Sequence, residues 1–168
     1  MYLKSICFLV LASIVILACN SGSRSSNDTN KDSLSSHTDS MRTGTDVEPI
    51  LKQADSLQIL YYDDPDGDSL RYSRFFTYTP TRDSNTIRYL LLCLEQPFVK
   101  LNAVKDCRSE GKIYMFDRED PLKTIYFSTR CDSCCYLYFI KSGAFLYFPL
   151  SDNMKRSLKE NKAKSQKP

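Results

Sequence analysis

The chain has 168 residues, enough for one ordinary domain with short appendages. Apolar residues make up 42%, which is compatible with a packed core, and 11 Tyr and 9 Phe without any Trp favour strands over a helical bundle. The formal net charge of +3 is too small for the basic face of a nucleic-acid-binding domain, so we expect no nucleic-acid partner.

Residues 1–18 have the pattern of an export signal. Lys4 and the free amine form a short positive region, and an apolar run from Ile6 to Ala18 follows, interrupted only by Ser13. As a helix this run reaches about 20 Å, whereas the hydrocarbon core of a bilayer is about 30 Å thick. The run therefore fits a cleaved signal peptide better than a membrane span.

The apolar run ends in Ile16-Leu17-Ala18-Cys19. This segment resembles the lipobox of bacterial lipoproteins, with an aliphatic residue three positions before the cysteine and a small residue just before it. The resemblance, which covers residues 1–19 only, implies cleavage between Ala18 and Cys19, a thioether from Cys19 to diacylglycerol, and acylation of the new amine, for example with palmitate. Several acyl chains bind a membrane far more firmly than one. We therefore expect a lipid-anchored protein at a cell membrane or outer membrane, with its domain outside the cytoplasm.

Residues 19–46 connect this cysteine to the rest of the chain. Beyond Leu34 and Met41 they contain almost no large apolar side chains and are rich in Ser, Asn, Thr and Asp. Such a segment cannot bury enough surface to offset its ordering entropy, which predicts a disordered tether. A flexible linker of this length has an end-to-end distance of about 30 Å.

A short helix and a hairpin are predicted at the start of the domain. Apolar residues recur at three- and four-residue spacing over 47–54, and Asp46 is placed as an N-cap. Strand-like segments at 57–62 and 70–79 flank a turn-rich acidic segment at 63–68, as in a β-hairpin.

The clearest helical stripe runs from Ile87 to Leu94, with Asp83 as its cap and Pro97 beyond its end. Residues 98–110 are expected to form an irregular connection. Another helix is expected to start at Asp152. Four further segments rich in β-branched or aromatic residues are predicted strands: 112–117, 122–129, 134–140 and 144–150, the last two joined by a Ser142-Gly143 turn.

Strands joined by such short turns must pair antiparallel. The sequence therefore predicts one α+β domain over residues 47–160, an antiparallel sheet of about six strands with two or three helices, and the Leu-rich helix packed on one face. Consecutive aromatic residues in the strands at 134–140 and 144–150 place aromatic rings on the second face as well, as core or as a binding surface. The basic residues 161–168 are expected to form a disordered tail.

Five cysteines follow Cys19, and an odd number leaves at least one thiol unpaired within a monomer. Because disulfides persist outside the cytoplasm, we expect one or two structural disulfides that join Cys131 or Cys134 to Cys107 or Cys93. Two alternatives use the same residues: thiol redox chemistry at the CxxC spacing, or a metal site with Cys107, Cys131 and Cys134 as weak candidate ligands. However, the CxxC segment precedes a strand rather than opening a helix, and no second CxxC exists.

Other catalytic patterns are sparse. The only histidine, His37, lies in the tether, which leaves the domain without a Ser–His or Cys–His pair. The Asp64, Asp66 and Asp68 spacing lacks the Gly and Glu that an EF-hand loop requires, so we interpret it as an acidic turn. A carboxylate-dependent enzyme acting on envelope polysaccharide remains an alternative.

The leading hypothesis is a non-enzymatic, membrane-anchored envelope lipoprotein that serves as a binding or structural module for a protein or other envelope partner. No catalytic residue is assigned, and no cofactor is expected beyond the covalent lipid on Cys19.

Overall fold

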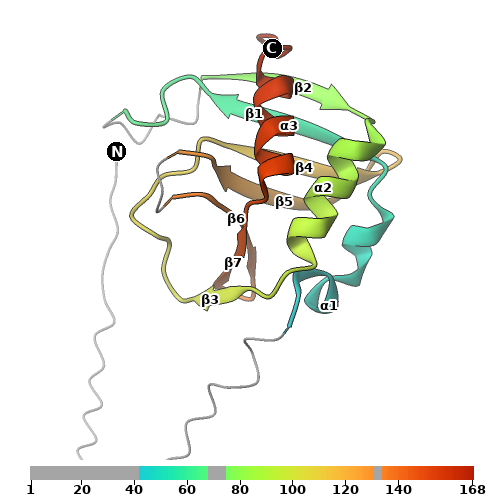
Figure 1. Cartoon of the computed structure of the whole chain (residues 1–168), viewed down its shortest axis with the longest axis vertical. Helices are drawn as coiled ribbons and strands as arrows, with labels where there is room; N and C mark the ends of the chain where they lie inside the picture. Colours follow the sequence, from blue (N-terminus) through green and yellow to red (C-terminus); the bar gives the residue numbers. More distant parts are fainter. Residues whose placement is uncertain (1–41, 68–74, 131–133) are drawn as a thin grey trace, which may run out of the picture. The chain divides into compact units, whose positions relative to one another are not determined.

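The computed structural model describes residues 42–67, 75–130 and 134–168. These residues form one antiparallel sheet with three α-helices and one 3₁₀ helix, which confirms the predicted α+β fold (Figure 1). The sheet contains seven strands, slightly more than the predicted six. No helix within the described ranges is long and apolar enough to cross a membrane.

The elements follow one another along the chain as α1 (Gly44–Val47), the 3₁₀ helix η2 (Pro49–Gln53), β1 (Ser56–Tyr62), β2 (Phe76–Thr81), α2 (Ser84–Leu94), β3 (Val99–Leu101), β4 (Gly111–Asp117), β5 (Asp120–Ser128), β6 (Tyr136–Lys141), β7 (Ala144–Pro149) and α3 (Asp152–Lys162). The strand order in the sheet is β2-β1-β4-β5-β6-β7-β3. Every neighbouring pair is antiparallel, as the short turns predict.

The helix predicted over 47–54 is divided into α1 and η2. Pro49 disfavours the α conformation at the preceding residue, and Glu48 accordingly has φ −141° and ψ 71°. Asp46, predicted as the N-cap, instead completes a capping box with Thr43, whose N–H donates to the Asp46 carboxylate at 2.9 Å. The folded unit therefore includes residues that the sequence assigns to the tether.

The predicted cap of α2 is observed: the Asp83 carboxylate accepts a 2.8 Å hydrogen bond from the Thr86 amide. The seventh strand, β3, lies within the predicted irregular connection 98–110 and pairs with β7 at one edge of the sheet. β3 is only three residues long, and Val99 and Lys100 are exposed. A strand this short and exposed has no hydrophobic pattern from which it could be predicted.

The hairpin between β6 and β7 turns at Ser142 and Gly143, as the sequence predicts. Both residues have positive φ, 50° and 77°. This is the conformation that a two-residue turn needs to match the twist of its strands, and glycine adopts it without steric cost.

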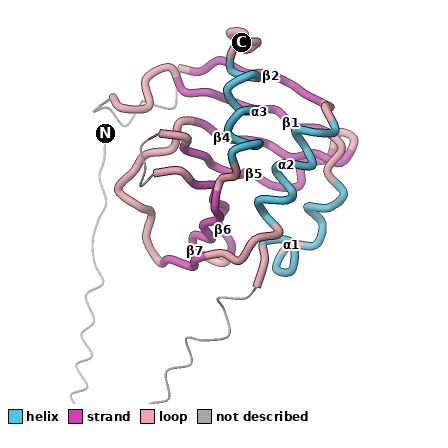
Figure 2. The backbone as a smooth tube through the Cα atoms, viewed as in Figure 1, coloured by secondary structure: helices cyan, strands magenta, loops and turns pink. Residues whose placement is uncertain are grey.

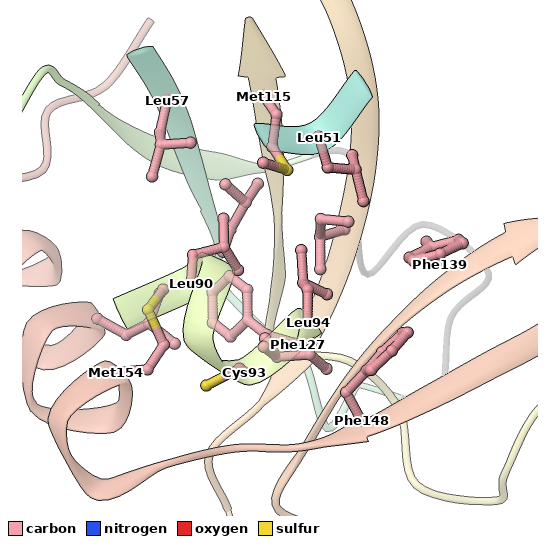
Figure 3. Packing of buried hydrophobic residues seen from close by; sticks show 14 of the residues in the cluster. Leu51, Leu57, Leu90, Cys93, Leu94, Met115, Phe127, Phe139, Phe148 and Met154 are labelled. Carbon is pink, nitrogen blue, oxygen red and sulfur yellow. The ribbon is translucent and has the colours of Figure 1, made fainter. Parts of the chain in front are cut away.

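The main core lies between the sheet and helices α2 and α3, which cover one of its faces (Figures 1 and 2). Ile59, Ile113 and Ile125 stand opposite one another across β1, β4 and β5, and all three are fully buried. Leu90 of α2 and Met154 of α3 meet them from the helical layer (Figure 3). Complete burial of each such side chain contributes about 1.5–3 kcal/mol.

The second face of the sheet carries a smaller aromatic core. Tyr136, Tyr138 and Tyr147 are buried there, and the rings of Tyr126 and Tyr138 stack with centroids 4.8 Å apart. The connection after β3 covers them, since the Lys105 amide donates a 2.9 Å hydrogen bond to the Tyr147 hydroxyl. Of the two roles that the sequence leaves open for these rings, the structure favours core.

The C-terminal segment differs from the predicted disordered tail. Helix α3 extends to Lys162, and Gln166 then forms two backbone hydrogen bonds with Tyr78 of β2, at 2.8 and 3.0 Å. The Ser165 hydroxyl adds a 2.8 Å bond to the Thr77 hydroxyl. β2 is an edge strand, so its outer N–H and C=O groups are available to the returning chain.

Candidate functional site

The sequence-predicted lipidation site lies outside the described residues, as do its cleavage residues. Ala18 and Cys19 belong to the range 1–41, and Cys131 belongs to the range 131–133. The structural account of function therefore rests on the domain.

Among the candidate disulfide cysteines, the structure brings Cys107 and Cys134 to disulfide distance, with their Cα atoms 5.9 Å apart and a separation of 27 positions in sequence. Cys93 lies elsewhere, buried on α2, where its thiol donates a 3.3 Å hydrogen bond to the Ser151 hydroxyl. When Cys107 and Cys134 are oxidised to a disulfide, their sulfurs are not thiolates and do not serve as zinc ligands.

The described ranges contain no group of three His, Cys, Asp or Glu side chains close enough to hold a metal ion. In the acidic turn after β1, Asp66 forms an ion pair with Arg130, and the Gly67 carbonyl accepts a hydrogen bond from Arg108. Asp68 lies outside the described residues. The described part of the turn is thus held by two basic side chains, Arg130 on Asp66 and Arg108 on the Gly67 carbonyl.

A cleft of about 650 Å³ lies beside α3, at the end of the sheet where β1 and β5 finish and β4 begins. We call it the α3 cleft. The sequence does not predict this cleft, because a run of basic residues near the C-terminus is equally typical of a solvent-exposed helix end. Its lining residues are Tyr61, Glu110, Phe127, Thr129, Asp152, Lys155, Arg156, Leu158, Lys159 and Lys162.

Helix α3 supplies one wall of the cleft because its side chains divide between two faces. The buried face consists of Met154, Ser157, Leu158 and Asn161 and packs on the sheet and α2. Four basic residues follow the same helical spacing on the exposed side and line the cleft: Lys155, Arg156, Lys159 and Lys162. One face of this amphipathic helix thus covers the core, and the other face supplies the positively charged side chains of the cleft.

The back of the cleft is apolar and firmly held. The rings of Tyr61 and Phe127 pack edge to face with centroids 5.7 Å apart, and the Tyr61 hydroxyl donates a 2.8 Å hydrogen bond to the Leu158 carbonyl. Burial raises the pKa of Tyr61 well above its usual value. Because these two side chains are nearly buried, they expose little apolar surface, and the aliphatic stems of the lysines add to the apolar wall.

The acidic side chains of the cleft are fewer and partly engaged. The Glu110 carboxylate accepts hydrogen bonds from the amide and the hydroxyl of Thr129, the latter at 2.6 Å, and lies 3.7 Å from the Arg130 Nε. Asp152 stands in the first turn of α3, where a negative charge complements the helix dipole.

In contrast, no ion pair joins any of the four basic residues of the cleft to a carboxylate among the described residues. Lys162 lies over the ring of Tyr61, 6.0 Å from its centroid, and Lys155 Nζ is 3.9 Å from the Cys135 sulfur. With four basic and two acidic lining residues, the cleft has an excess of two positive charges.

A second hollow of about 500 Å³ lies beside the Cys107–Cys134 pair. Asp66, Asp106, Arg108 and Arg130 line it, so its basic and acidic side chains are equal in number, and Arg130 already pairs with Asp66. This balance leaves it less suited than the α3 cleft to attract a charged ligand.

The chain matches no family model, no curated protein and no solved structure in the comparisons made. A fold class such as α+β hosts many unrelated functions. Function is therefore argued from the chemistry of the site.

Proposed function

We propose that this protein is a membrane-anchored binding module of the bacterial cell envelope, and that its ligand occupies the α3 cleft. The observation that carries this proposal is the cleft itself. Its volume of about 650 Å³ lies within the range typical of small-molecule sites, about 300–1,000 Å³. Its excess of positive charge favours an anionic ligand.

The N-terminal sequence supports the anchored location. The signal-like residues 1–18 and the lipobox ending at Cys19 imply a lipid-modified mature N-terminus. A tether of about 30 Å would hold the domain near the membrane surface and leave the cleft accessible. The proposed location of the protein is thus a cell membrane or outer membrane, with the domain outside the cytoplasm.

Binding fits the lining residues of the cleft better than catalysis does. A general acid or base must exchange a proton with its substrate, which requires an accessible carboxyl group or an amine of lowered pKa. Of the two lining carboxylates, Glu110 is already engaged by Thr129 and Arg130, and Asp152 is exposed in the first turn of α3, where the helix dipole stabilises its negative charge. The basic residues are exposed and suited to electrostatic attraction.

The binding site can be tested by NMR on the chain from Asn20 onward, exported with a conventional cleavable signal so that it is soluble without lipid. Mixtures of anionic metabolites, acidic peptides and neutral glycans would be added to the labelled protein. We expect saturable chemical-shift changes that centre on Lys155, Lys159 and Thr129. Shift changes confined to the opposite face of the sheet, or hydrolysis of a ligand that is lost in Glu110→Gln, would overturn the proposal.

The anchor has its own test in the full precursor. Cys19→Ser should abolish labelling with a radioactive fatty acid, and globomycin should cause the unprocessed precursor to accumulate. Cys7→Ser, which changes a cysteine within the signal, is the matched control and should be labelled normally. Normal labelling of Cys19→Ser would contradict the lipoprotein assignment.

A further inference from the structure

We infer that the α3 cleft recognises a phosphate monoester, an inference that rests on the proposed role of this cleft as a ligand site. The first support is charge balance. The lining residues leave an excess of two positive charges, and a phosphate monoester carries a charge of about −1.5 to −2 at pH 7. A dianion would neutralise the cleft, whereas a monocarboxylate or a sulfate monoester, with one negative charge each, would neutralise it only in part.

The second support is the arrangement of the cations. Lys155, Lys159 and Lys162 follow one another at four- and three-residue spacing, so their stems leave α3 from one side at successive turns. Ammonium groups on long flexible stems can converge on one compact anion with several acceptor oxygens. Arg156 adds a planar fork that matches two phosphate oxygens.

The third support concerns the rest of the ligand. A peptide would bring backbone N–H donors that need acceptors in the cleft. Glu110 is engaged by Thr129 and Arg130, and the Tyr61 hydroxyl is directed to the Leu158 carbonyl, which leaves Asp152 as the remaining lining carboxylate, too few acceptors for a run of peptide N–H groups. The organic part of a small ester needs few acceptors and can lie along the lysine stems. This comparison favours a phosphate ester over an acidic peptide.

The phosphate monoester could belong to either of two kinds of ligand, a soluble phosphate ester or a lipid headgroup with a terminal phosphate. Both present a dianionic phosphate on an organic group. The cleft recognises this shared feature, and the experiment distinguishes the source.

The test uses the soluble chain from Asn20 with phenyl phosphate and phenyl sulfate, which share one shape and differ in charge. NMR titration at pH 7.5 should show phenyl phosphate binding at the α3 cleft about tenfold or more tightly than phenyl sulfate, because it makes additional charge-assisted hydrogen bonds. Affinity for phenyl phosphate should fall between pH 7 and pH 5, as the phosphate dianion takes up one proton and becomes a monoanion.

Matched variants locate the effect. Lys155→Gln/Lys159→Gln should weaken phenyl phosphate binding about tenfold or more, and Lys164→Gln/Lys167→Gln, which removes the same charge outside the cleft, should leave it nearly unchanged. Gln is a good helix former at positions 155 and 159, and Lys164 and Lys167 are exposed beyond the end of α3, so circular dichroism should show intact folds in both variants. Equal affinity in both double variants would overturn the inference.

The source is decided by flotation of the same protein with phosphatidylcholine vesicles that contain phosphatidic acid or, as a monoanionic control, phosphatidylglycerol. Selective binding to phosphatidic acid that phenyl phosphate displaces supports a lipid headgroup, and phenyl phosphate binding without flotation supports a soluble ester. If sulfate or peptide ligands occupy the cleft as tightly as phenyl phosphate, the phosphate inference fails and the binding module stands. If no ligand shifts cleft residues, both fail.

Discussion

The hydroxyl of Tyr61 donates a 2.8 Å hydrogen bond to the main-chain carbonyl of Leu158, a residue 97 positions further along the chain. The bond joins the end of β1 to α3 directly behind the cleft. One turn further on, the Thr79 hydroxyl of β2 donates a 2.8 Å bond to the carbonyl of Asn161. Two adjacent strands therefore fix the height of α3 over the sheet, and with it the position of the basic residues that line the cleft.

Replacing Tyr61 by Phe should lower the free energy of unfolding by about 1 kcal/mol, because it removes the hydrogen bond and preserves the ring packing against Phe127. Urea denaturation of the chain from Asn20 measures this difference. A variant as stable as the parent would show that the bond to Leu158 contributes nothing.

The same substitution should alter the alkaline limit of stability. Burial raises the pKa of Tyr61, so near pH 10 and above the unfolded chain releases this proton while the folded chain retains it. The stability that depends on protonated Tyr61 is complete below pH 10 and is lost as the pH rises above it. Urea titrations from pH 8 to pH 11 should show that Tyr61→Phe loses less stability over this range than the parent does.

Leu90→Ala should cost about 2–5 kcal/mol, because Leu90 is fully buried between α2 and the sheet and its removal leaves a cavity. Leu92→Ala, on the same helix, is the matched control. Leu92 is 48% exposed, so the same deletion should cost well under 1 kcal/mol. Similar losses in the two variants would contradict the observed orientation of α2.

Asp83→Ala should lower the melting temperature by a few degrees, because it removes the N-cap of α2. Asp83→Asn keeps an acceptor for the Thr86 amide and should retain most of this stability at pH 7. Hydrogen bonds from the side chain and then the backbone of Thr86 lower the pKa of Asp83. Its contribution is therefore present above its ordinary pKa of about 3.8 and declines as the pH falls below that value, and Asp83→Asn should lack this acid-dependent loss.

The Cys107–Cys134 pairing predicts one cross-linked peptide when the chain is made in an oxidising compartment and digested without reduction. Closing a loop with this separation typically stabilises by about 2–4 kcal/mol, so Cys107→Ser should lose about this amount. Cys107→Ser/Cys134→Ser should lose little more, because the first substitution already opens the loop. A cross-link from Cys107 to any other cysteine would contradict the pairing.

Local patterns were enough to predict much of the fold. Turn residues between short aromatic segments predict antiparallel strands, and the stripe from Ile87 to Leu94 after Asp83 predicts α2 and its cap. These features depend on residues near one another in sequence, which is why they can be read there. The predicted lipobox at Cys19 is local in the same sense, and this prediction comes from the sequence alone.

Only the tertiary structure decided the remaining features, because each depends on residues far apart in the chain. β3 forms because its backbone pairs with β7 at one edge of the sheet. Gln166 is held by backbone hydrogen bonds to Tyr78 of β2 at the other edge. Cys134 lies near Cys107, rather than near Cys93, because of how the connection after β3 crosses the sheet. The cleft arises where α3 passes the ends of β1 and β5, so its basic residues acquire a common wall only through long-range packing.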